Sequence, residues 1–327
     1  MAAIERVAVV GSGTMGRQIA IQIARGGVPV ALYDVDPAAL ARAQEAQRAF
    51  VEGFVAGGTL AAAESAPLLA RIRYDVDLGA ATRDADLIIE AVPEQLALKR
   101  QVFAALDEHA PEGAILATNS SSIRVSLLED ATARPERCAN FHFYLPVWDN
   151  PMVEVGGGTR TAPAALDALD AFARQIGLLP LRVLRESTGF IFNRVWRAIK
   201  KEVLAVADGG IASFEDIDRA WMIHYRTPKG PFGKMDEIGL DVVQAIEEVY
   251  AAESNDPADR PPPLLTERVA RGDLGQKSGR GFYTYPDPAW AAPDFLTPEA
   301  TPEATPEAKP GGAAMHDGTD HDDEEAR

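Results

Sequence analysis

The chain has 327 residues, of which 46% are hydrophobic, and a formal net charge of −17. Its length predicts two domains with a sizeable core. Residues 291–327 carry −8 of the charge, and the mild acidity of the remainder argues against nucleic acid or anionic membrane as a partner. No run of eighteen apolar residues and no secretory signal is visible, and Cys138 is the single cysteine, so we expect a cytoplasmic protein without disulfides.

The amino-terminal stretch predicts a dinucleotide site. Four apolar residues, 7–10, run into three glycines with the G-x-G-x-x-G spacing, and residues 17–25 follow as a helix. The glycines make the turn, admit a pyrophosphate and let the helix pack on the strand, while the helix start offers free N–H groups. A second apolar run, 28–33, ends at Asp34, whose carboxylate binds ribose hydroxyls and disfavours NADP. The residues of the predicted NAD site are Gly11, Ser12, Gly13, Thr14, Met15, Gly16 and Asp34. FAD sites share this fingerprint, so the identity of the cofactor depends on residues further along.

Alternating helices and strands then predict a parallel sheet. Helices are expected at 38–56, 61–71 and from residue 96 to 106, and strands at 72–74, 86–94 and 114–118. The last strand delivers Asn119-Ser120-Ser121-Ser122 at its carboxyl end, which is the edge where open α/β sheets bind ligands.

The pattern changes after residue 137. Short strands are predicted at 138–143 and 152–155, then a helix at 163–176 and a strand at 178–183. Only helices follow, at 190–208, 213–222, 239–252 and 262–271, with residues 209–210 and 228–233 as breaks. We therefore predict an α/β Rossmann-type domain over 1–185, an all-helical domain over 186–290 and a disordered Pro/Glu/Asp-rich tail over 291–327. His316 and His321 lie in that tail, and we expect them to be solvated rather than metal-bound.

One histidine stands out for chemistry. His142 lies at the end of a predicted strand in the sheet region, and Glu154 lies on the next strand, which can pair back with it. An imidazole can take a hydroxyl proton while hydride leaves the same carbon, and a carboxylate partner fixes its tautomer. From spacing alone, a buried histidine satisfied by a convenient acid is an equally good interpretation.

The spaced motifs together resemble the L-3-hydroxyacyl-CoA dehydrogenase family. The matching stretches lie in family order over residues 7–283: Gly11 to Gly16 with Asp34, Glu90 to Glu94, Asn119 to Ser122, Asn140 to His142, Met152 to Val155, Gly189 to Arg194, and Lys277 to Tyr283. The resemblance implies a Rossmann domain, a helical domain that forms a homodimer, NAD as cofactor, and reversible oxidation of an (S)-3-hydroxyacyl-CoA to the 3-oxoacyl-CoA.

The resemblance also implies roles for particular residues. His142 matches the catalytic base and Glu154 its partner, while Ser121 and Asn193 match the residues that hydrogen-bond the reacting oxygen. The residues that match the lining of the nicotinamide ribose site are Glu94, Lys99 and Asn119. Without the resemblance, Ser121 would be interpreted as a turn or cap residue and Asn193 as a polar residue on a helix face.

The chain departs from the family pattern at three places. Ser120 replaces the threonine of Asn-Thr-Ser-Ser, and Leu145 replaces the asparagine of His-Phe-Phe-Asn-Pro. No lysine precedes Lys99 to meet the phosphates of CoA, so the substitutes on offer are Arg42, Arg48, Arg71 and Arg73. Two alternatives therefore stay open: a dehydrogenase of a free 3-hydroxy acid, as in the gulonate and carnitine dehydrogenases, and an NAD(H)-binding protein without turnover.

Overall fold

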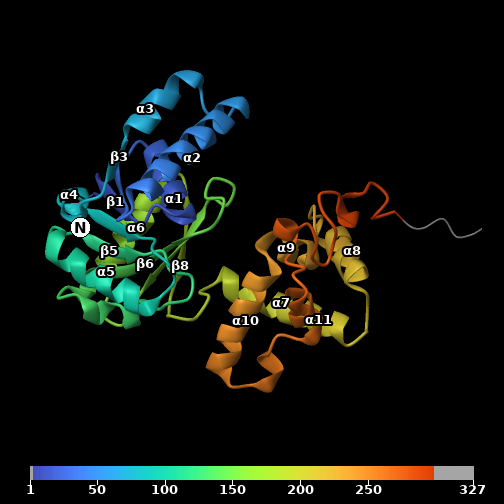
Figure 1. Cartoon of the computed structure of the whole chain (residues 1–327). Coiled ribbons are helices and arrows are strands. Elements are labelled where there is room, and N and C mark those ends of the chain that lie inside the picture. Colours follow the sequence, from blue (N-terminus) through green and yellow to red (C-terminus); the bar gives the residue numbers. More distant parts are fainter. Residues whose placement is uncertain (1–2, 298–327) are drawn as a thin grey trace, which may run out of the picture. The chain divides into compact units, whose positions relative to one another are not determined.

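The computed structural model describes residues 3–297 and divides into two compact units between Lys200 and Lys201 (Figure 1). The first unit is a sheet covered by helices, and the second is built from helices. The boundary predicted near residue 185 lies in the segment between β8 (Leu179–Val183) and α7 (Phe192–Asp208). Among the residues described, no helix has the length and apolar character that crossing a membrane requires.

Eight strands form one sheet in the first unit. Besides β8 they are β1 (Val7–Val10), β2 (Val30–Tyr33), β3 (Ile72–Asp75), β4 (Leu87–Glu90), β5 (Ile115–Thr118), β6 (Cys138–Phe143) and β7 (Met152–Gly157). Their order is β3-β2-β1-β4-β5-β6-β7-β8, and neighbouring strands are parallel except for β6 and β7. Strands β2 and β3 are added on one side of β1, and the strands from β4 onward are added on its other side. This change of side places the topological switch point between β1 and β4, beside the glycine loop. The predicted Rossmann-type architecture is confirmed.

Helices cover both faces of this sheet. They are α1 (Thr14–Arg25), α2 (Pro37–Ala56), α3 (Ser65–Ala70), α4 (Leu78–Thr82), α5 (Leu96–His109) and α6 (Pro163–Gln175). Alternate residues of each strand point to opposite faces, so Val7 and Val9 pack with α1 and α6, while Ala8 and Val10 pack with α5. The five-residue α4 was not predicted, because a helix of about one turn is too short for its hydrophobic period to show.

The second unit contains the end of α7 and four further helices, α8 (Phe214–Tyr225), α9 (Pro231–Ile238), α10 (Leu240–Ser254) and α11 (Pro263–Ala270). The predicted break at 228–233 is wrong in its last three residues, because α9 begins at Pro231. Proline suits the first position of a helix, where its missing N–H would have no partner. The buried carboxylate of Asp218 accepts the N–H groups of Phe232 and Gly233 at 2.8 and 3.0 Å and so caps this helix.

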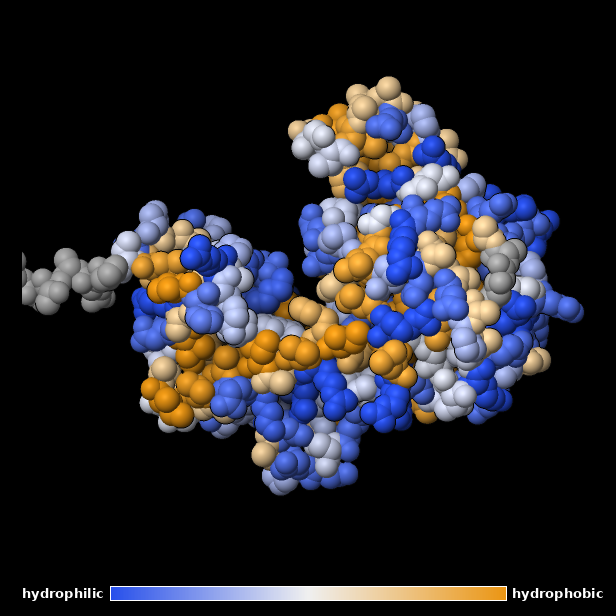
Figure 2. Space-filling view, turned by 180° about the vertical axis from the view of Figure 1, so that it is seen from behind, coloured by the Kyte–Doolittle hydropathy of each residue, from blue (hydrophilic) through white to orange (hydrophobic). Residues whose placement is uncertain are grey.

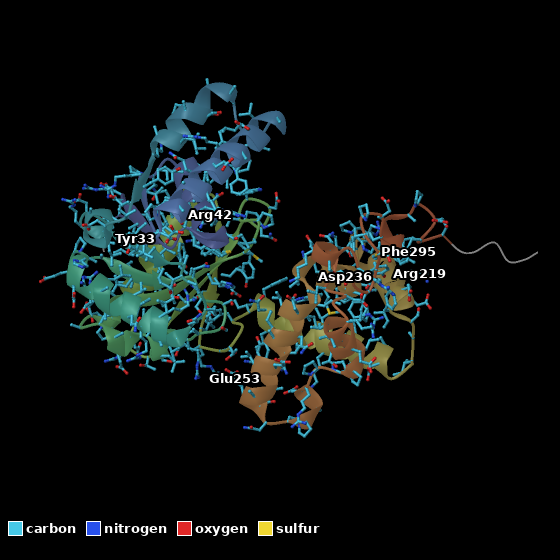
Figure 3. The ribbon with its side chains drawn as sticks, viewed as in Figure 1. Tyr33, Arg42, Arg219, Asp236, Glu253 and Phe295 are labelled. Atoms are coloured by element: carbon cyan, nitrogen blue, oxygen red, sulfur yellow. The ribbon has the colours of Figure 1, made fainter. Side chains whose placement is uncertain are left out.

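A second buried acid ties the carboxyl-terminal motif to the same core. Asp236, which is labelled in Figure 3, accepts the N–H groups of Phe282 and Tyr283, both at 2.8 Å. The Tyr283 hydroxyl donates to Asp218 at 2.9 Å. A Cβ at Gly281 would lie 2.1 Å from an oxygen of Asp236, so glycine is required there. Burial raises the pKa of Asp218 to about 6 although these hydrogen bonds oppose it, and burial also raises the pKa of Asp236. The motif at 277–283 therefore holds the helical unit together.

The start of the predicted disordered tail is wrong. Phe295 is only 7% exposed, and the guanidinium of Arg219 lies 4.5 Å above its ring (Figure 3). Arg219 also donates to the carbonyl oxygen of Phe295 at 3.0 Å. The side chain of Phe295 thus anchors residues 291–297. The average composition of residues 291–327 gave no indication of this anchor. The remaining tail, with His316 and His321, lies outside the described residues.

Candidate active site

The glycine loop follows β1 and leaves space beside the start of α1. Gly11 has a φ of +104°, and a Cβ there would lie 2.7 Å from the carbonyl oxygen of Ala91. A Cβ at Gly16 would lie 1.8 Å from the carbonyl oxygen of Gly11, so α1 packs against the loop only without a side chain. At Gly13 nothing lies within 4 Å of the Cβ position. The loop therefore has the open approach at its middle glycine that a pyrophosphate needs.

Asp34 holds the glycine loop from the end of β2. One carboxylate oxygen accepts both the N–H and the hydroxyl of Ser12 at 2.8 Å, and the other accepts the N–H of Asp36 at 3.0 Å. A carboxylate accepts about four hydrogen bonds, so one direction is left for a ribose hydroxyl. The residues that fit an adenosine ribose and pyrophosphate are therefore present together at the carboxyl ends of β1 and β2.

Lys99 is 1% exposed and lies inside a network of acids. Its ammonium is 2.8 Å from Glu90, 3.2 Å from the carbonyl oxygen of Val92 and 3.2 Å from Glu94. These three partners use all the donors of an ammonium group. Lys99 therefore has no donor left for a ligand, and it affects the rest of the site through its contact with Glu94. The sequence did not single out Glu90 as a site residue, although it begins the matching stretch Glu90 to Glu94.

Glu94 in turn ties down the serine turn after β5. It accepts the hydroxyl of Ser120, and the N–H and hydroxyl of Ser122 at 3.1 and 2.7 Å. Burial would raise the pKa of Glu94, but the charge of Lys99 and the serine hydrogen bonds outweigh it and lower that pKa. Both neighbours of Ser121 are thus fixed, while the Ser121 hydroxyl has no hydrogen-bond partner within residues 3–297.

Asparagines lock the serine turn to β6. The side-chain oxygen of Asn119 accepts the N–H of Phe143 at 2.9 Å. The amide of Asn140 donates to the carbonyl oxygens of Thr118 and Ser120 at 3.2 and 2.9 Å. Ser121 is consequently held at the same sheet edge as the end of β6.

His142 and Glu154 face each other across the antiparallel pair β6–β7. They are direct partners in the strand register, both side chains are buried, and Nδ1 of His142 lies 2.9 Å from Oε2 of Glu154. A carboxylate only accepts, so Nδ1 carries the proton that it donates to Glu154. The other nitrogen, Nε2, is then left unprotonated and able to accept a proton.

Glu154 also anchors the start of α7. Its second oxygen, Oε1, accepts the N–H groups of Ile191 and Phe192 at 2.8 and 2.9 Å. Burial would raise the pKa of Glu154, but hydrogen bonds from His142 and the Phe192 N–H outweigh it and leave that pKa below the usual range. Asn193 follows directly in the first turn of α7, and its side chain has no hydrogen-bond partner among the described residues.

Two aromatic rings enclose the imidazole of His142. The ring of Tyr144 lies 4.5 Å from it and that of Phe190 lies 5.8 Å from it, measured between ring centres. Phe190 has a φ of +47°, a conformation that is rare for a side chain of this size and is typical of functional sites. Neither ring was predicted, because the contacts join segments far apart in the sequence.

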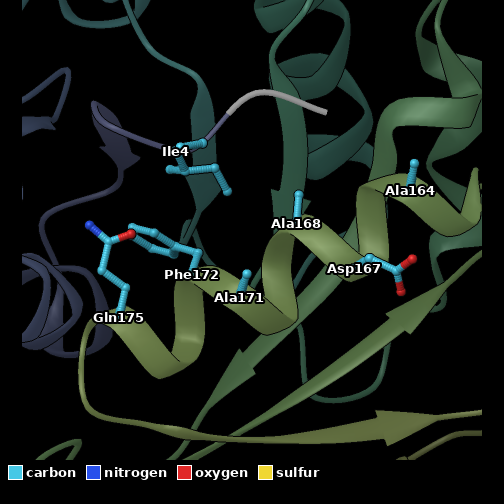
Figure 4. Close-up of a pocket in the computed structure, with 8 residues that line it drawn as sticks. Ile4, Ala164, Asp167, Ala168, Ala171, Phe172 and Gln175 are labelled. Atoms are coloured by element: carbon cyan, nitrogen blue, oxygen red, sulfur yellow. The ribbon is translucent and has the colours of Figure 1, made fainter.

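Other recesses of the first unit contain none of the residues predicted for catalysis or for the NAD site. One of about 440 Å³ lies on the outer face of α6, beside Ile4 and a row of alanines (Figure 4). Another, of about 360 Å³, includes Arg6, Arg71 and Arg73 and lies where β1, β2 and β3 begin. The glycine loop follows the carboxyl end of β1, so Arg71 and Arg73 lie at the opposite sheet edge. Within residues 3–297 no group of three metal-ligating side chains is placed to bind an ion.

Comparison with known protein families gives two matches that together span most of the chain. Residues 6–187 match the NAD binding domain of 3-hydroxyacyl-CoA dehydrogenase, and residues 189–285 match its C-terminal domain.

Individual relatives agree with this. The chain is 35% identical to a 3-hydroxybutyryl-CoA dehydrogenase of Mycobacterium tuberculosis over 86% of this chain and 99% of that protein. It is 33% identical to 5-formyl-3-hydroxy-2-methylpyridine 4-carboxylate 5-dehydrogenase of Mesorhizobium japonicum over 86% of this chain and 91% of that protein. The crystal structure of (S)-3-hydroxybutyryl-CoA dehydrogenase from Ralstonia eutropha is 34% identical and superposes with a TM-score of 0.82, covering 87% of this chain and 100% of that one.

Proposed function

The chain belongs to the 3-hydroxyacyl-CoA dehydrogenase family, and from this premise we propose that it oxidises an (S)-3-hydroxyacyl-CoA to the 3-oxoacyl-CoA, reversibly. It is an NAD-dependent oxidoreductase, as the family is. The observation that carries the proposal is the buried His142–Glu154 pair, which leaves Nε2 as the one ring nitrogen able to accept a proton.

His142 is the general base of this proposal. Its Nε2 takes the proton of the substrate hydroxyl, and Glu154 stabilises the imidazolium that results. A bound NAD would supply the acceptor for the hydride that leaves the hydroxyl-bearing carbon of the substrate. The low pKa of Glu154 keeps it a carboxylate throughout, so the proton stays on the imidazole until it is released.

Ser121 and Asn193 hold the reacting oxygen in this proposal. Both side chains lack partners within residues 3–297, and both sit on backbone that is fixed by neighbours. Glu94 holds the turn that carries Ser121, and Glu154 holds the helix start that carries Asn193. Positioning of this kind supplies much of the acceleration when reacting groups are held before the step.

The shape of the glycine loop and the contacts around it indicate which residues bind NAD. Gly11 to Gly16 receive the pyrophosphate and Asp34 a ribose hydroxyl, while Glu94 and Asn119 border the nicotinamide side with Lys99 acting behind Glu94.

A free 3-hydroxy acid is the second candidate substrate, and three of the four arginines offered for the phosphates of CoA favour it. Arg71 and Arg73 lie at the opposite edge of the sheet, Arg73 is paired with Asp75 at 3.0 Å, and Arg42 is paired with Asp36 at 3.3 Å. The Mesorhizobium japonicum relative is, by its name, a dehydrogenase of a pyridine carboxylate, which is a free acid.

A substrate panel tests both candidates. Equal concentrations of 3-hydroxybutyryl-CoA, longer 3-hydroxyacyl-CoA thioesters, free 3-hydroxybutyrate, gulonate and carnitine are mixed with NAD, and NADH absorbance is followed. We expect the highest kcat/KM with a thioester. A higher kcat/KM with a free acid would replace the first candidate by the second, and no NADH from any hydroxy substrate would overturn both.

We also propose that the chain forms a homodimer through its helical unit. Figure 2 shows hydrophobic side chains gathered on the surface of that unit. On α10, Val242, Ile246 and Val249 are 42%, 39% and 50% exposed and recur at the spacing of one helix face. An exposed apolar stripe of this kind is typical of a protein interface.

A further inference from the structure

We propose that Asn140 is a positioning residue for the oxidation: the NH2 end of its side chain holds the turn that carries Ser121 at a fixed place relative to His142. The inference rests on the proposed function, because it concerns how Ser121 and His142 meet the same substrate hydroxyl. Asn140 is only 1% exposed, so it acts through the turn and not by contact with a ligand.

The backbone pairing of β5 with β6 ends before the turn begins. Thr118 and Asn140 are the last partners in register, and β6 continues to Phe143 after β5 has ended. From there the side chain of Asn140 bridges the two segments, donating to the carbonyl oxygens of Thr118 and Ser120 at 3.2 and 2.9 Å. The amide group thus extends the link between the strands to the residue next to Ser121.

Asn140 joins the turn to the strand of the base. It lies two residues before His142 on β6, so both side chains point to the same face of the sheet. Another support of the turn, Glu94, accepts the hydroxyls of Ser120 and Ser122 and is one of the residues proposed to border the nicotinamide. Glu94 therefore places the turn against the cofactor, and Asn140 places it against the base.

The other end of the Asn140 amide has no partner. Its oxygen, Oδ1, is buried and accepts no hydrogen bond within residues 3–297. Carbonyl oxygens only accept, so the NH2 end faces Thr118 and Ser120 and the oxygen cannot take its place. Gly156, opposite Asn140 in the register with β7, has no side chain to offer a donor. A buried oxygen without a partner costs stability, and residues that carry such a cost are typical of functional sites.

Two variants remove the NH2 group. Asn140→Leu keeps the branched shape of the side chain, and Asn140→Ala removes most of it. We expect both to lower kcat for oxidation by about tenfold, because Ser121 is then held less closely beside the substrate oxygen. NADH affinity, measured by calorimetric titration, should stay within about threefold of wild type, since the glycine loop and Asp34 follow β1 and β2, which are not neighbours of β6.

A combination with Ser121→Ala shows whether Asn140 acts through Ser121. In a chain that already carries Ser121→Ala, Asn140→Leu should lower kcat by less than about twofold, because the hydroxyl that it positions is gone. Asn150→Ala is the matched control, since the Asn150 amide also donates to two carbonyl oxygens, those of Leu145 and Pro146, at 2.9 and 3.1 Å. Its effect on kcat should be the same with and without the Ser121 hydroxyl.

Hydrogen exchange tests the position of the turn without turnover. The N–H groups of Ser120, Ser122 and Ile123 donate to side chains of the site. In the cofactor-free protein, Asn140→Leu should speed the exchange of these groups, followed by mass spectrometry, by at least about tenfold, and Asn150→Ala should leave it unchanged. Thermal melting of each variant checks that it folds.

The exchange measurement and the kcat comparison are independent. Unchanged exchange in a folded Asn140→Leu or Asn140→Ala would overturn the role of Asn140 in holding the turn. A loss of kcat that is equally large with and without the Ser121 hydroxyl would overturn its action through Ser121. By contrast, a wild-type protein that reduces NAD with no hydroxy substrate refutes the proposed function and leaves the exchange comparison readable.

Discussion

At the scale of residues, one carboxylate organises the candidate site. Glu154 receives His142 on one oxygen and the first N–H groups of α7 on the other. A single side chain thus positions both the base His142 and the helix that carries Asn193. Loss of Glu154 would leave the imidazole free to turn and the start of α7 without its acceptor, so its removal is expected to cost more than the removal of a hydrogen bond to an exposed group.

The role of His142 leads to the first prediction. His142→Gln keeps a polar side chain but cannot take up a proton, so kcat for oxidation should fall at least about 100-fold, the usual scale for loss of a general base. NADH production under saturating substrate measures it. His224→Gln, at an exposed position of α8, is the control and should keep wild-type turnover. Full activity in His142→Gln would remove His142 from the mechanism.

The open space at Gly13 leads to the second prediction. Gly13→Ala places a methyl group where nothing lies within 4 Å in the protein, at a backbone conformation that alanine adopts (φ −62°). The variant should fold normally but bind NADH at least about tenfold more weakly, because the methyl group occupies the approach of the pyrophosphate.

Gly53→Ala is the matched control for Gly13→Ala, since its Cβ position is equally open but lies within α2. NADH affinity should be unchanged there, and stability should rise by up to about 1 kcal/mol because alanine is the better helix former. Calorimetric titration with NADH distinguishes the two variants. Equal NADH affinities in Gly13→Ala and Gly53→Ala would mean that the glycine loop does not receive the phosphates.

Short-range patterns made part of the site predictable. The glycine spacing, Asp34 and the pairing of His142 with Glu154 depend on strand period and turn chemistry, which the sequence displays directly. The acceptors and rings around them were not predicted. Glu90 holds Lys99, Tyr144 contacts His142, and Phe190 adopts a positive φ through contacts that exist only after distant segments have packed together.

At the scale of elements, strand and helix types were predictable where their hydrophobic period was long. The antiparallel β6–β7 pair formed as expected, because two short β-rich segments were joined by a connection with turn residues. The failures have local causes. Helix α9 was hidden by Pro231 and Gly233, which look like a break until the buried acceptor Asp218 is known to cap the helix.

That buried acceptor gives the third prediction. The pKa of Asp218 is raised from 3.8 to about 6, so between these pH values the folded chain holds a proton that the unfolded chain has lost. Stability therefore falls as pH rises through this window, by up to about 3 kcal/mol from this group. Asp218→Asn removes the titration, so melting temperature between pH 4 and pH 6.5 should fall less steeply than in wild type.

The control for the Asp218 prediction lies on the same helix. Asp216 is exposed, and hydrogen bonds from Ser213 and Arg219 lower its pKa. Asp216→Asn should therefore leave the fall in melting temperature in place. If the melting temperature falls equally steeply with pH in Asp218→Asn and in wild type, the carboxyl group of Asp218 does not take up its proton in this window.

At the scale of the whole molecule, two units with different architectures share one chain. The division into a sheet unit and a helical unit was predictable, since the strand period disappears after β8. The extent of the second unit was not. Residues 291–297 belong to it through the single aromatic anchor Phe295, which a segment judged by its average composition does not reveal.

The exposed stripe on α10 gives the fourth prediction. Ile246→Glu puts a charge in the middle of the stripe formed with Val242 and Val249. If the stripe is the proposed homodimer interface, an unpaired buried charge should weaken the dimer at least about 100-fold, so that sedimentation velocity reports a monomer at low micromolar concentration.

The control substitution for the stripe is Glu248→Lys, which changes the charge at an exposed polar position of α10. It should leave the sedimentation coefficient of wild type unchanged. A wild-type chain that sediments as a monomer would contradict the homodimer, and an Ile246→Glu variant that stays dimeric would move the interface to another face.

The hairpin of β6 and β7 has a consequence for how this scaffold diversifies. Backbone pairing in the ladder, not the connection, sets the alignment of His142 with Glu154. In the connection, residues 145–150, Leu145 is exposed, whereas Val147 is fully buried and the Trp148 ring lies 4.9 Å from those of Phe50 and Phe54. Exchange at Leu145 therefore leaves the ladder, and with it the acid–base pair, inherited intact.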